Sequence, residues 1–262
     1  SEMCIRDRME RGSKHILEQK KILEKNPHKK NEAIPNRNIK CNLKAYQFAN
    51  FISVASQHVK ESFLLHQYPE NRIFVNPYGV DLSMFKPLPN IPKKYDVIMV
   101  GGWGYEKGCD LIVEAIRKTN YSFIHVGSIK DVDFPQEKNF THIDPVDQSK
   151  LIEYYNQAKV FILPSRQDGF GMVLSQALAC NLPIIGSNNC GAPDLKKMVE
   201  LPEYITIIKD YTADAIVTAI HTAIKNYEQL GERIYAGNAI ENLTWEAYGK
   251  RYANFLHKII KQ

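Results

Sequence analysis

The sequence is poor in cysteine and lacks the spacings that mark common metal and nucleophile sites. Its five cysteines are odd in number and include no Cys-x-x-Cys pair, which argues against a disulfide framework or a zinc site and favours a reducing, cytoplasmic location. No His-Glu-x-x-His, Gly-x-Ser-x-Gly or P-loop segment occurs, so zinc-protease, hydrolase-elbow and P-loop chemistry are unsupported. No apolar run reaches the roughly 18 residues that a membrane-spanning helix needs. We therefore expect neither a metal nor a bound cofactor.

Basic residues are concentrated at the beginning of the chain. Residues 1–60 hold 13 Lys or Arg against 6 Asp or Glu, a net charge of +7, whereas the remaining residues carry −2 of the total of +5. A basic segment of this kind can contact anionic lipid headgroups, or it can be the solvated face of a helix. No aromatic interleaving accompanies the charge, so nucleic acid is not an expected partner. Weak peripheral contact with a membrane surface stays open.

The second half of the sequence holds a strand, a glycine turn and a helix in immediate succession. Residues 160–163 form a short apolar run of the buried-strand type. Gly169 and Gly171 form a tight turn, and residues 172–180 favour a helix. Asn181 follows where a left-handed C-cap residue belongs. Because glycine has no side chain, the backbone at Gly169 and Gly171 can approach a ligand closely just before the helix.

This glycine turn predicts an anion site. The start of a helix directs free backbone N–H groups at whatever lies above the sheet edge, and phosphate suits such a site best. Asp168 lies just before the helix and Gln176 in its second turn, so their side chains could sit roughly 10 Å apart. A nucleotide sugar, with hydroxyls at both ends and a diphosphate between, fits this spacing. The structural alternative is that Asp168 caps the helix and the glycines only form a turn.

A second glycine-rich turn lies earlier in the chain. Residues 101–108 separate an expected strand at 95–100 from an expected helix at 109–119, and Lys107 lies near the end of the turn. A lone glycine turn is a weak signal for phosphate binding. The structural alternative is an exposed lysine beside a turn.

Strands alternate with helices along the whole sequence, which predicts a doubly wound parallel α/β sheet with ligands at the carboxyl ends of its strands. Both glycine turns fall at such ends. The expected strands are 51–55, 73–76, 95–100, 121–126, 140–143, 159–163, 182–185 and 204–208; the expected helices are 11–25, 43–50, 58–67, 109–119, 150–157, 172–180, 213–227, 231–241 and 244–260; residues 27–42, 131–139 and 186–194 are expected to be loops.

The segment around Gly169 and Gly171 resembles the donor-site signature of retaining GT-B glycosyltransferases of glycosyltransferase family 4, the group 1 transferases. Their pattern is Glu-x-Phe-Gly, four residues, Glu, and then Ala-x-Ala-x-Gly-x-Pro-Val-Ile. Here Asp168 stands for the first Glu and Gln176 for the second. Aspartate is shorter by one methylene but keeps the charge, and glutamine keeps an acceptor while adding donors.

Three other segments resemble the same family. Residues 77–87 are similar to its Pro-Asn-Gly-Val-Asp-x-x-x-Phe-x-Pro junction. Residues 101–108 are similar to Val-Gly-Arg-Leu-x-x-Glu-Lys-Gly, with Gly102 in place of the arginine. Residues 186–194 are similar to a Thr-x-x-Gly-Gly-x-x-Glu loop, in which Gly191 matches. Losing the arginine removes one cation from the expected diphosphate site.

The resemblance implies transfer of a sugar from a nucleoside-diphosphate sugar to an acceptor hydroxyl with retention, without a metal. It assigns catalytic roles to Lys107, which would stabilise the leaving diphosphate, and to Asp168, which would hold sugar hydroxyls. Gln176 would bind the ribose. The remaining residues expected to bind the donor are Gly101, Gly102, Gly169, Phe170, Gly171 and Gly191.

The resemblance also implies a GT-B type architecture, with a Rossmann-like C-terminal domain and a partial N-terminal Rossmann-like domain. Residues 1–87 are expected to be what remains of a truncated acceptor domain, with 1–8 an artefact of sequencing. Residues 88–94 would be the linker, 95–244 the donor-binding domain, and 245–262 a helix that crosses back to the N-terminal domain.

Two other functions stay open at this point. The altered Asp168 and Gln176 pair would suit a module that binds nucleotide sugars without transferring them. Another GT-B chemistry, such as nucleotide-sugar epimerisation, would use the same donor site. The acceptor could be a glycan, a lipid or a small molecule.

Overall fold

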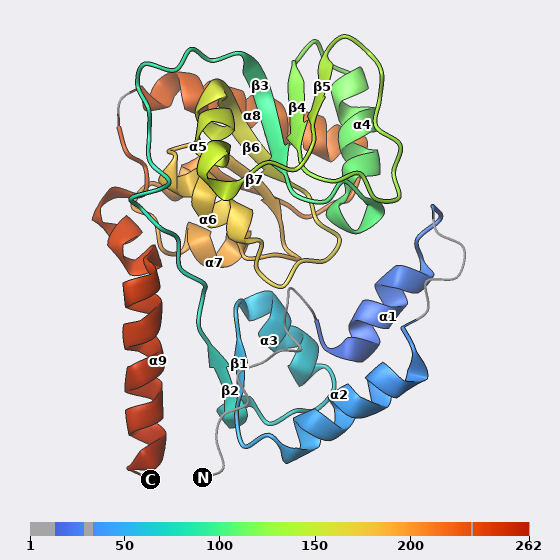
Figure 1. Cartoon of the computed structure of the whole chain (residues 1–262), viewed down its shortest axis with the longest axis vertical. Coiled ribbons are helices and arrows are strands. Elements are labelled where there is room, and N and C mark those ends of the chain that lie inside the picture. Colours follow the sequence, from blue (N-terminus) through green and yellow to red (C-terminus); the bar gives the residue numbers. More distant parts are fainter. Residues whose placement is uncertain (1–13, 29–33, 232, 262) are drawn as a thin grey trace.

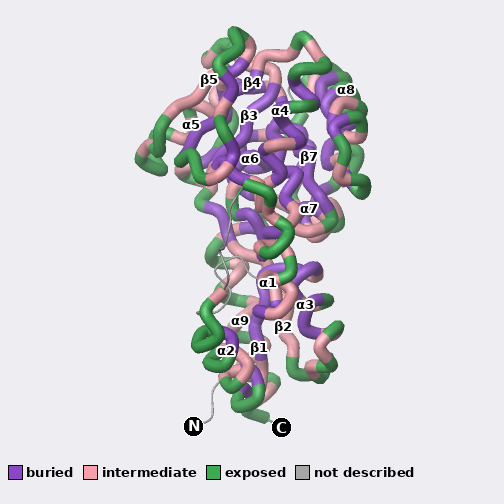
Figure 2. Tube along the Cα trace, turned by 90° about the vertical axis from the view of Figure 1, so that its right-hand side faces the viewer, coloured by how far each residue is buried: buried purple, intermediate pink, exposed green. Residues whose placement is uncertain are grey.

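Two hydrophobic cores of unequal size organise the chain, and Figure 1 shows the helices and strands that surround them. The computed structural model describes residues 14–28, 34–231 and 233–261. The larger core surrounds a six-stranded sheet, and the smaller one surrounds a two-stranded sheet near the N-terminus. Buried residues accordingly gather in two places along the trace in Figure 2.

The larger sheet is parallel throughout, with the strand order β5-β4-β3-β6-β7-β8. This is the doubly wound order, and it confirms the expected α/β class. The last four residues of β3 and of β6 are all buried, because helices cover both faces of a parallel sheet. The strands are β3 (Tyr95–Val100), β4 (Phe123–Val126), β5 (Phe140–Ile143), β6 (Ala158–Leu163), β7 (Ile184–Ser187) and β8 (Ile205–Ile208).

Helices pack on both faces of this sheet (Figure 1). On one face α8 crosses β6, β7 and β8 and packs against α4, while α5, α6 and α7 lie on the other. Helix α8 buries Ile216, Ala219, Ile220 and Ala223, the spacing of an amphipathic helix that faces a core. The helices are α4 (Cys109–Arg117), α5 (Gln148–Gln157), α6 (Met172–Ala179), α7 (Ala192–Lys196) and α8 (Ala213–Leu230).

The N-terminal part forms the smaller unit, and the last helix packs beside it (Figure 1). The ring of Phe255 in α9 stacks on Phe74 with centroids 4.0 Å apart, and Arg251 Nε donates to Asn76 Oδ1 at 2.7 Å. The elements are α1 (Ile16–Glu24), α2 (Asn36–Phe48), β1 (Ile52–Val54), α3 (Gln57–Leu64), β2 (Ile73–Val75) and α9 (Trp245–Ile260), with short 3₁₀ turns η1 (Glu70–Arg72), η2 (Tyr105–Lys107), η3 (Pro202–Tyr204) and η4 (Gly237–Leu243).

The expected loop at 27–42 is wrong over its second half, where α2 begins at Asn36. The stretch is polar and basic and holds Pro27 and Pro35, which favours a loop, but Pro35 stands just before the helix, where its missing N–H costs nothing. Ile39 and Tyr46 are buried in the smaller core, and Leu43 packs against it, which is helical spacing. The expected helix at 11–25 is confirmed only from Ile16, since residues 1–13 lie outside the described residues.

Two expectations in the C-terminal half are also wrong. The helix expected at 231–241 is absent, because Gly231 and Gly237 both have φ of 57°, which interrupts a helix; the described part of this stretch holds only the 3₁₀ turn η4. The expected turn at 186–194 is shorter, since β7 continues to Ser187 and α7 begins at Ala192.

The structure confirms the helix caps that the sequence predicts at Ser56 and at Asp147, for which Ser149 was the alternative. Ser56 accepts a hydrogen bond from the Val59 amide at the start of α3, and Asp147 accepts one from the Ser149 amide at the start of α5. Asn181 has φ of 61°, the left-handed conformation expected after α6. Among the described residues, no helix is long and apolar enough to cross a bilayer.

Buried histidines should make stability fall at acidic pH. Burial lowers the pKa of His58 to about 3 and that of His125 to about 4, whereas an unfolded histidine titrates near 6.5. Below pH 6.5 the unfolded chain therefore binds protons that the folded chain does not. We expect the free energy of unfolding to fall by up to about 1.4 kcal/mol per pH unit for each such group.

Chemical denaturation from pH 7 to pH 4 measures this slope. His58→Leu should flatten it, because His58 is 8% exposed and its Nε2 has no hydrogen-bond partner within the described chain. His257→Leu changes an exposed side chain of α9 and should keep the wild-type slope. A slope that His58→Leu leaves unchanged would contradict the assignment.

Candidate functional site

The site lies where the strand order reverses. Strands β3 and β6 are neighbours at the centre of the sheet, and later strands extend outward from each. Ligands of doubly wound sheets bind at this point, outside the carboxyl ends of the strands. The loop after β3 holds residues 101–108 and the loop after β6 holds residues 164–171, so the two glycine turns found in the sequence lie next to each other.

An ion pair joins the two turns. Lys107 Nζ lies 2.6 Å from Asp168 Oδ2, with side chains 20% and 12% exposed. Burial alone would lower the pKa of Lys107, but the Asp168 and Glu106 carboxylates outweigh burial and hold its pKa above the usual value. Lys107 is therefore charged at neutral pH. The exposed-lysine alternative is wrong.

The glycine turn before α6 lies directly behind this pair. A Cβ built on Gly171 would lie 3.4 Å from Asp168 Oδ2, the same oxygen that binds Lys107. Gly171 has φ of 77° and is itself the N-cap of α6. Asp168 Oδ1 instead accepts from the Phe170 amide at 3.2 Å, so the interpretation of Asp168 as the cap of α6 is wrong.

The backbone amides of this turn differ in their hydrogen bonding. The Phe170 amide is engaged by Asp168, and the Phe170 ring is 1% exposed, so the aromatic side chain belongs to the core. Within the described ranges, no hydrogen bond engages the N–H of Gly169 or Gly171. Both glycines are buried, and their amides lie in the same turn as Asp168, which binds the Lys107 ammonium.

Arg166 fastens the two turns to each other. Its guanidinium forms a bidentate pair with Asp110 at 2.6 and 2.8 Å and donates to the Tyr105 carbonyl at 2.7 Å. The Arg166 amide donates to the Glu106 carbonyl at 2.9 Å. Gly108 makes this approach possible, because a Cβ there would lie 2.4 Å from the Pro164 carbonyl oxygen and its φ is 74°.

The loop after β7 completes the cluster and places Gly191 against Phe170. The Gly191 amide donates to the Phe170 carbonyl at 2.7 Å. A Cβ on Gly191 would lie 2.4 Å from the Phe170 ring, so the residue acts through close packing. The Asp168 amide donates to the Asn189 carbonyl at 2.9 Å.

Gly101 and Gly102 lie at the first turn but differ in their surroundings. Gly101 has φ of 124°, and its carbonyl lies 2.8 Å from His125 Nε2. Gly102 lies beneath the side chain of Lys130. Neither glycine offers a side chain to a ligand, so their contribution is backbone geometry and space.

Gln176 lines a different cavity from Lys107. Lys107 borders a pocket together with Glu106 and Lys130, whereas Gln176 borders one beside the junction and the start of α9, with Asp81 and Trp245. Tyr155 Oη donates to Gln176 Oε1 at 2.9 Å. This leaves the Gln176 amide NH₂ as the group able to face a ligand.

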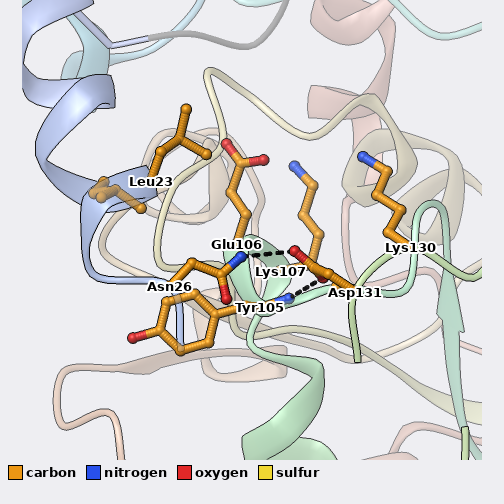
Figure 3. A pocket seen from close by; sticks show the side chains of 9 residues that line it. Leu23, Asn26, Tyr105, Glu106, Lys107, Lys130 and Asp131 are labelled. Carbon is orange, nitrogen blue, oxygen red and sulfur yellow. Dashed lines mark hydrogen bonds between the residues drawn. The ribbon is translucent and has the colours of Figure 1, made fainter. Parts of the chain in front are cut away.

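The N-terminal unit supplies site residues that the sequence did not reveal. The hydroxyl of Ser56 donates to the Gly169 carbonyl, and the Gln57 amide donates to both Asp194 carboxylate oxygens at 3.2 Å. Asn26 lines the Lys107 pocket and donates to Asp131 at 2.7 Å (Figure 3). In the sequence, Ser56 can be recognised only as a helix cap, and no pattern marks Asn26 as a site residue.

Solved structures with this architecture are GT-B glycosyltransferases. One is HepE from Anabaena in complex with UDP and glucose, with a TM-score of 0.69, 16% identity, and coverage of 86% of this chain and 67% of that one. At this identity the likeness shows the fold.

The family model for "Glycosyl transferases group 1" matches residues 83–239, more than half of the chain. The chain therefore belongs to this family, as its motifs suggested. A probable sucrose-phosphate synthase of Thermosipho melanesiensis is 26% identical over 82% of this chain and 56% of its own length. A GDP-mannose-dependent mannosyltransferase of Mycolicibacterium smegmatis, named for a phosphatidylinositol monomannoside, is 23% identical over 79% and 62%. The chain thus spans between half and two thirds of these relatives.

Removing the Arg166 guanidinium should destabilise the protein measurably. Arg166→Gln deletes a bidentate pair whose side chains are 18% and 22% exposed, and such charged hydrogen bonds contribute about 1.5–3 kcal/mol. Urea denaturation measures the loss. The matched control is Arg117→Gln, whose pair with Glu137 is 55% and 44% exposed and should change stability by less than about 1 kcal/mol. Equal effects of both variants would contradict the fastening role.

Proposed function

We propose that this chain is the donor-binding part of a retaining transferase, which moves a sugar from a nucleoside-diphosphate sugar to an acceptor hydroxyl. The observation that carries the proposal is the Lys107–Asp168 pair at the strand-order reversal, 2.6 Å apart and adjoining the backbone amides of a glycine turn. An ammonium and two backbone N–H groups form a site for a diphosphate. Family membership supports the same reaction class.

In the proposed reaction the bond between the sugar anomeric carbon and the diphosphate oxygen breaks, and the acceptor oxygen bonds to that carbon on the same face. The acceptor proton passes to the leaving phosphate. Lys107 stabilises the charge that develops on this phosphate, because an ammonium has three donors and can bind Asp168 and a phosphate oxygen together. Asp168 binds sugar hydroxyls, and Gln176 binds the ribose through its amide NH₂.

Calorimetric titration can identify the nucleotide base of the preferred donor. The compared proteins include one whose structure holds UDP and one named for GDP-mannose. Binding by this chain should be titrated calorimetrically with UDP-, GDP- and ADP-glucose and with GDP-mannose. Absence of binding to all four would overturn the proposal.

Lys107→Met should weaken binding of the preferred donor by at least tenfold, since it removes one charged contact to the diphosphate. Lys118→Met is the matched control, because Lys118 is half exposed and pairs on the surface with Asp214. Calorimetric titration of both variants compares them. If Lys107→Met binds the donor as tightly as the control, the ammonium has no part in the site.

A module that binds the donor without transferring it is the second candidate. The observation that favours it is the replacement of both expected glutamates, by Asp168 and Gln176, with Asp168 already engaged by Lys107. Asp168→Glu with Gln176→Glu should be compared with wild type in a version that carries a complete N-terminal domain. Turnover that appears only in the double variant would support the binding module, and wild-type turnover would support the transferase.

The remaining domain assignments belong to the same proposal. Residues 1–87 represent part of an acceptor domain, 88–94 the linker, 95–244 the donor-binding domain and 245–262 the returning helix. The separate N-terminal core supports this division, as do the contacts of α9 with Phe74 and Asn76. The acceptor would enter between the two units.

We also propose a cytoplasmic location, with the basic N-terminal part in weak contact with anionic lipid. The net charge of +7 on residues 1–60 supports it. Cosedimentation with vesicles that contain phosphatidylglycerol, compared with phosphatidylcholine alone, tests it. Equal cosedimentation with both kinds of vesicle would contradict the lipid contact and indicate that the positive charge belongs to a solvated surface.

A further inference from the structure

Lys130 is held beside the first glycine turn by the backbone. The segment after β4 runs parallel to that turn, with Trp103 and Ile129 paired. The Trp103 amide donates to the Ser128 carbonyl at 2.8 Å, and the Lys130 amide donates to the Trp103 carbonyl at 2.9 Å. The position of Lys130 is therefore set by two backbone bonds on either side of a buried tryptophan.

The side chain of Lys130 occupies the space that a side chain at position 102 would take. A Cβ built on Gly102 would lie 2.4 Å from Lys130 Cε, 3.0 Å from its Nζ and 3.1 Å from its Cδ. Residue 102 and Lys130 thus compete for one location. The bare glycine is what allows the lysine to lie across the turn.

Lys130 and Lys107 line the same pocket, and their amino groups point to the same side of it (Figure 3). Lys107 is paired with Asp168, whereas Lys130 makes no ion pair with any residue that the structure describes. Glu106 and Asp131 also border the pocket, but neither forms an ion pair with Lys130 in the described part of the chain. Of the two ammonium groups, Lys130 is the one without a competing partner.

We propose that Lys130 is a second diphosphate-binding cation, which enters from the loop after β4 into the space that Gly102 leaves empty. This inference rests on the proposed function and adds a residue to its binding site. The ligand class is the diphosphate of a nucleotide, bound between the ammonium groups of Lys107 and Lys130. Two ammonium groups around one diphosphate leave it better neutralised than Lys107 alone could.

The test measures calorimetric binding of UDP, GDP and ADP to the full chain, and then follows the tightest of the three. Lys130→Ala should weaken binding roughly five- to tenfold, as loss of one charged contact does. Lys138→Ala removes another exposed lysine from the same β4–β5 connection and should leave affinity unchanged. Circular dichroism shows whether each variant is folded.

A charge placed at position 102 should rescue the loss. In Lys130→Ala the competing side chain is gone, so Gly102→Arg can supply a cation from the opposite side of the same space. The double variant should recover most of the wild-type affinity. Lys130→Ala with Gly102→Gln adds a side chain of similar reach without charge and should not.

The outcomes separate this inference from the function on which it rests. If the wild-type chain binds none of the three diphosphates, both fail. If Lys107→Met weakens binding while Lys130→Ala matches Lys138→Ala, the proposed function stands and the role of Lys130 is refuted. Rescue by glutamine as strong as rescue by arginine would also refute it, because packing rather than charge would then explain the effect.

Discussion

The parallel pairing of β3 with β6 is the constraint on which the site depends. Lys107 and Asp168 are 61 residues apart in sequence, and each belongs to a loop that continues from one of these two strands. Parallel neighbours end at the same edge, so the two loops must share one location. The ion pair follows from this pairing, and it lies at the start of a buried helix.

Gly108 and Arg166 have complementary roles at this edge of the sheet. Gly108 lets the first loop approach the backbone of the second, because no side chain fits beside the Pro164 carbonyl. Arg166 holds the same loops together through a bidentate ion pair with Asp110 and a hydrogen bond to the Tyr105 carbonyl. One residue type permits close approach and the other maintains it. Backbone amides are thereby fixed in place before a ligand arrives, which lowers the reorganisation that binding requires.

Sequence reasoning predicted what is local and missed what depends on pairing. The two glycine turns, their helices and the capping by Ser56 follow from patterns within a few residues, and the structure has them where expected. The start of α2 was missed because the polar, basic stretch with Pro27 and Pro35 favours a loop. Lys130 was missed for another reason: its relation to Gly102 depends on how the chain after β4 lies along a neighbouring loop, which no spacing in the sequence records.

Three hydrogen bonds between the start of α3 and the sheet edge link the two cores. Ser56 binds the Gly169 carbonyl while it also caps α3, and Asp194 accepts from the Gln57 amide at the same helix start. Moving α3 away would leave the Gly169 carbonyl and the Asp194 carboxylate without these hydrogen bonds. Burial already raises the pKa of Asp194. Each polar group left unpaired costs about 1–3 kcal/mol. Hinge motion of the smaller core is therefore opposed by bonds to the glycine turn itself, so separating the two cores would also release the Gly169 carbonyl.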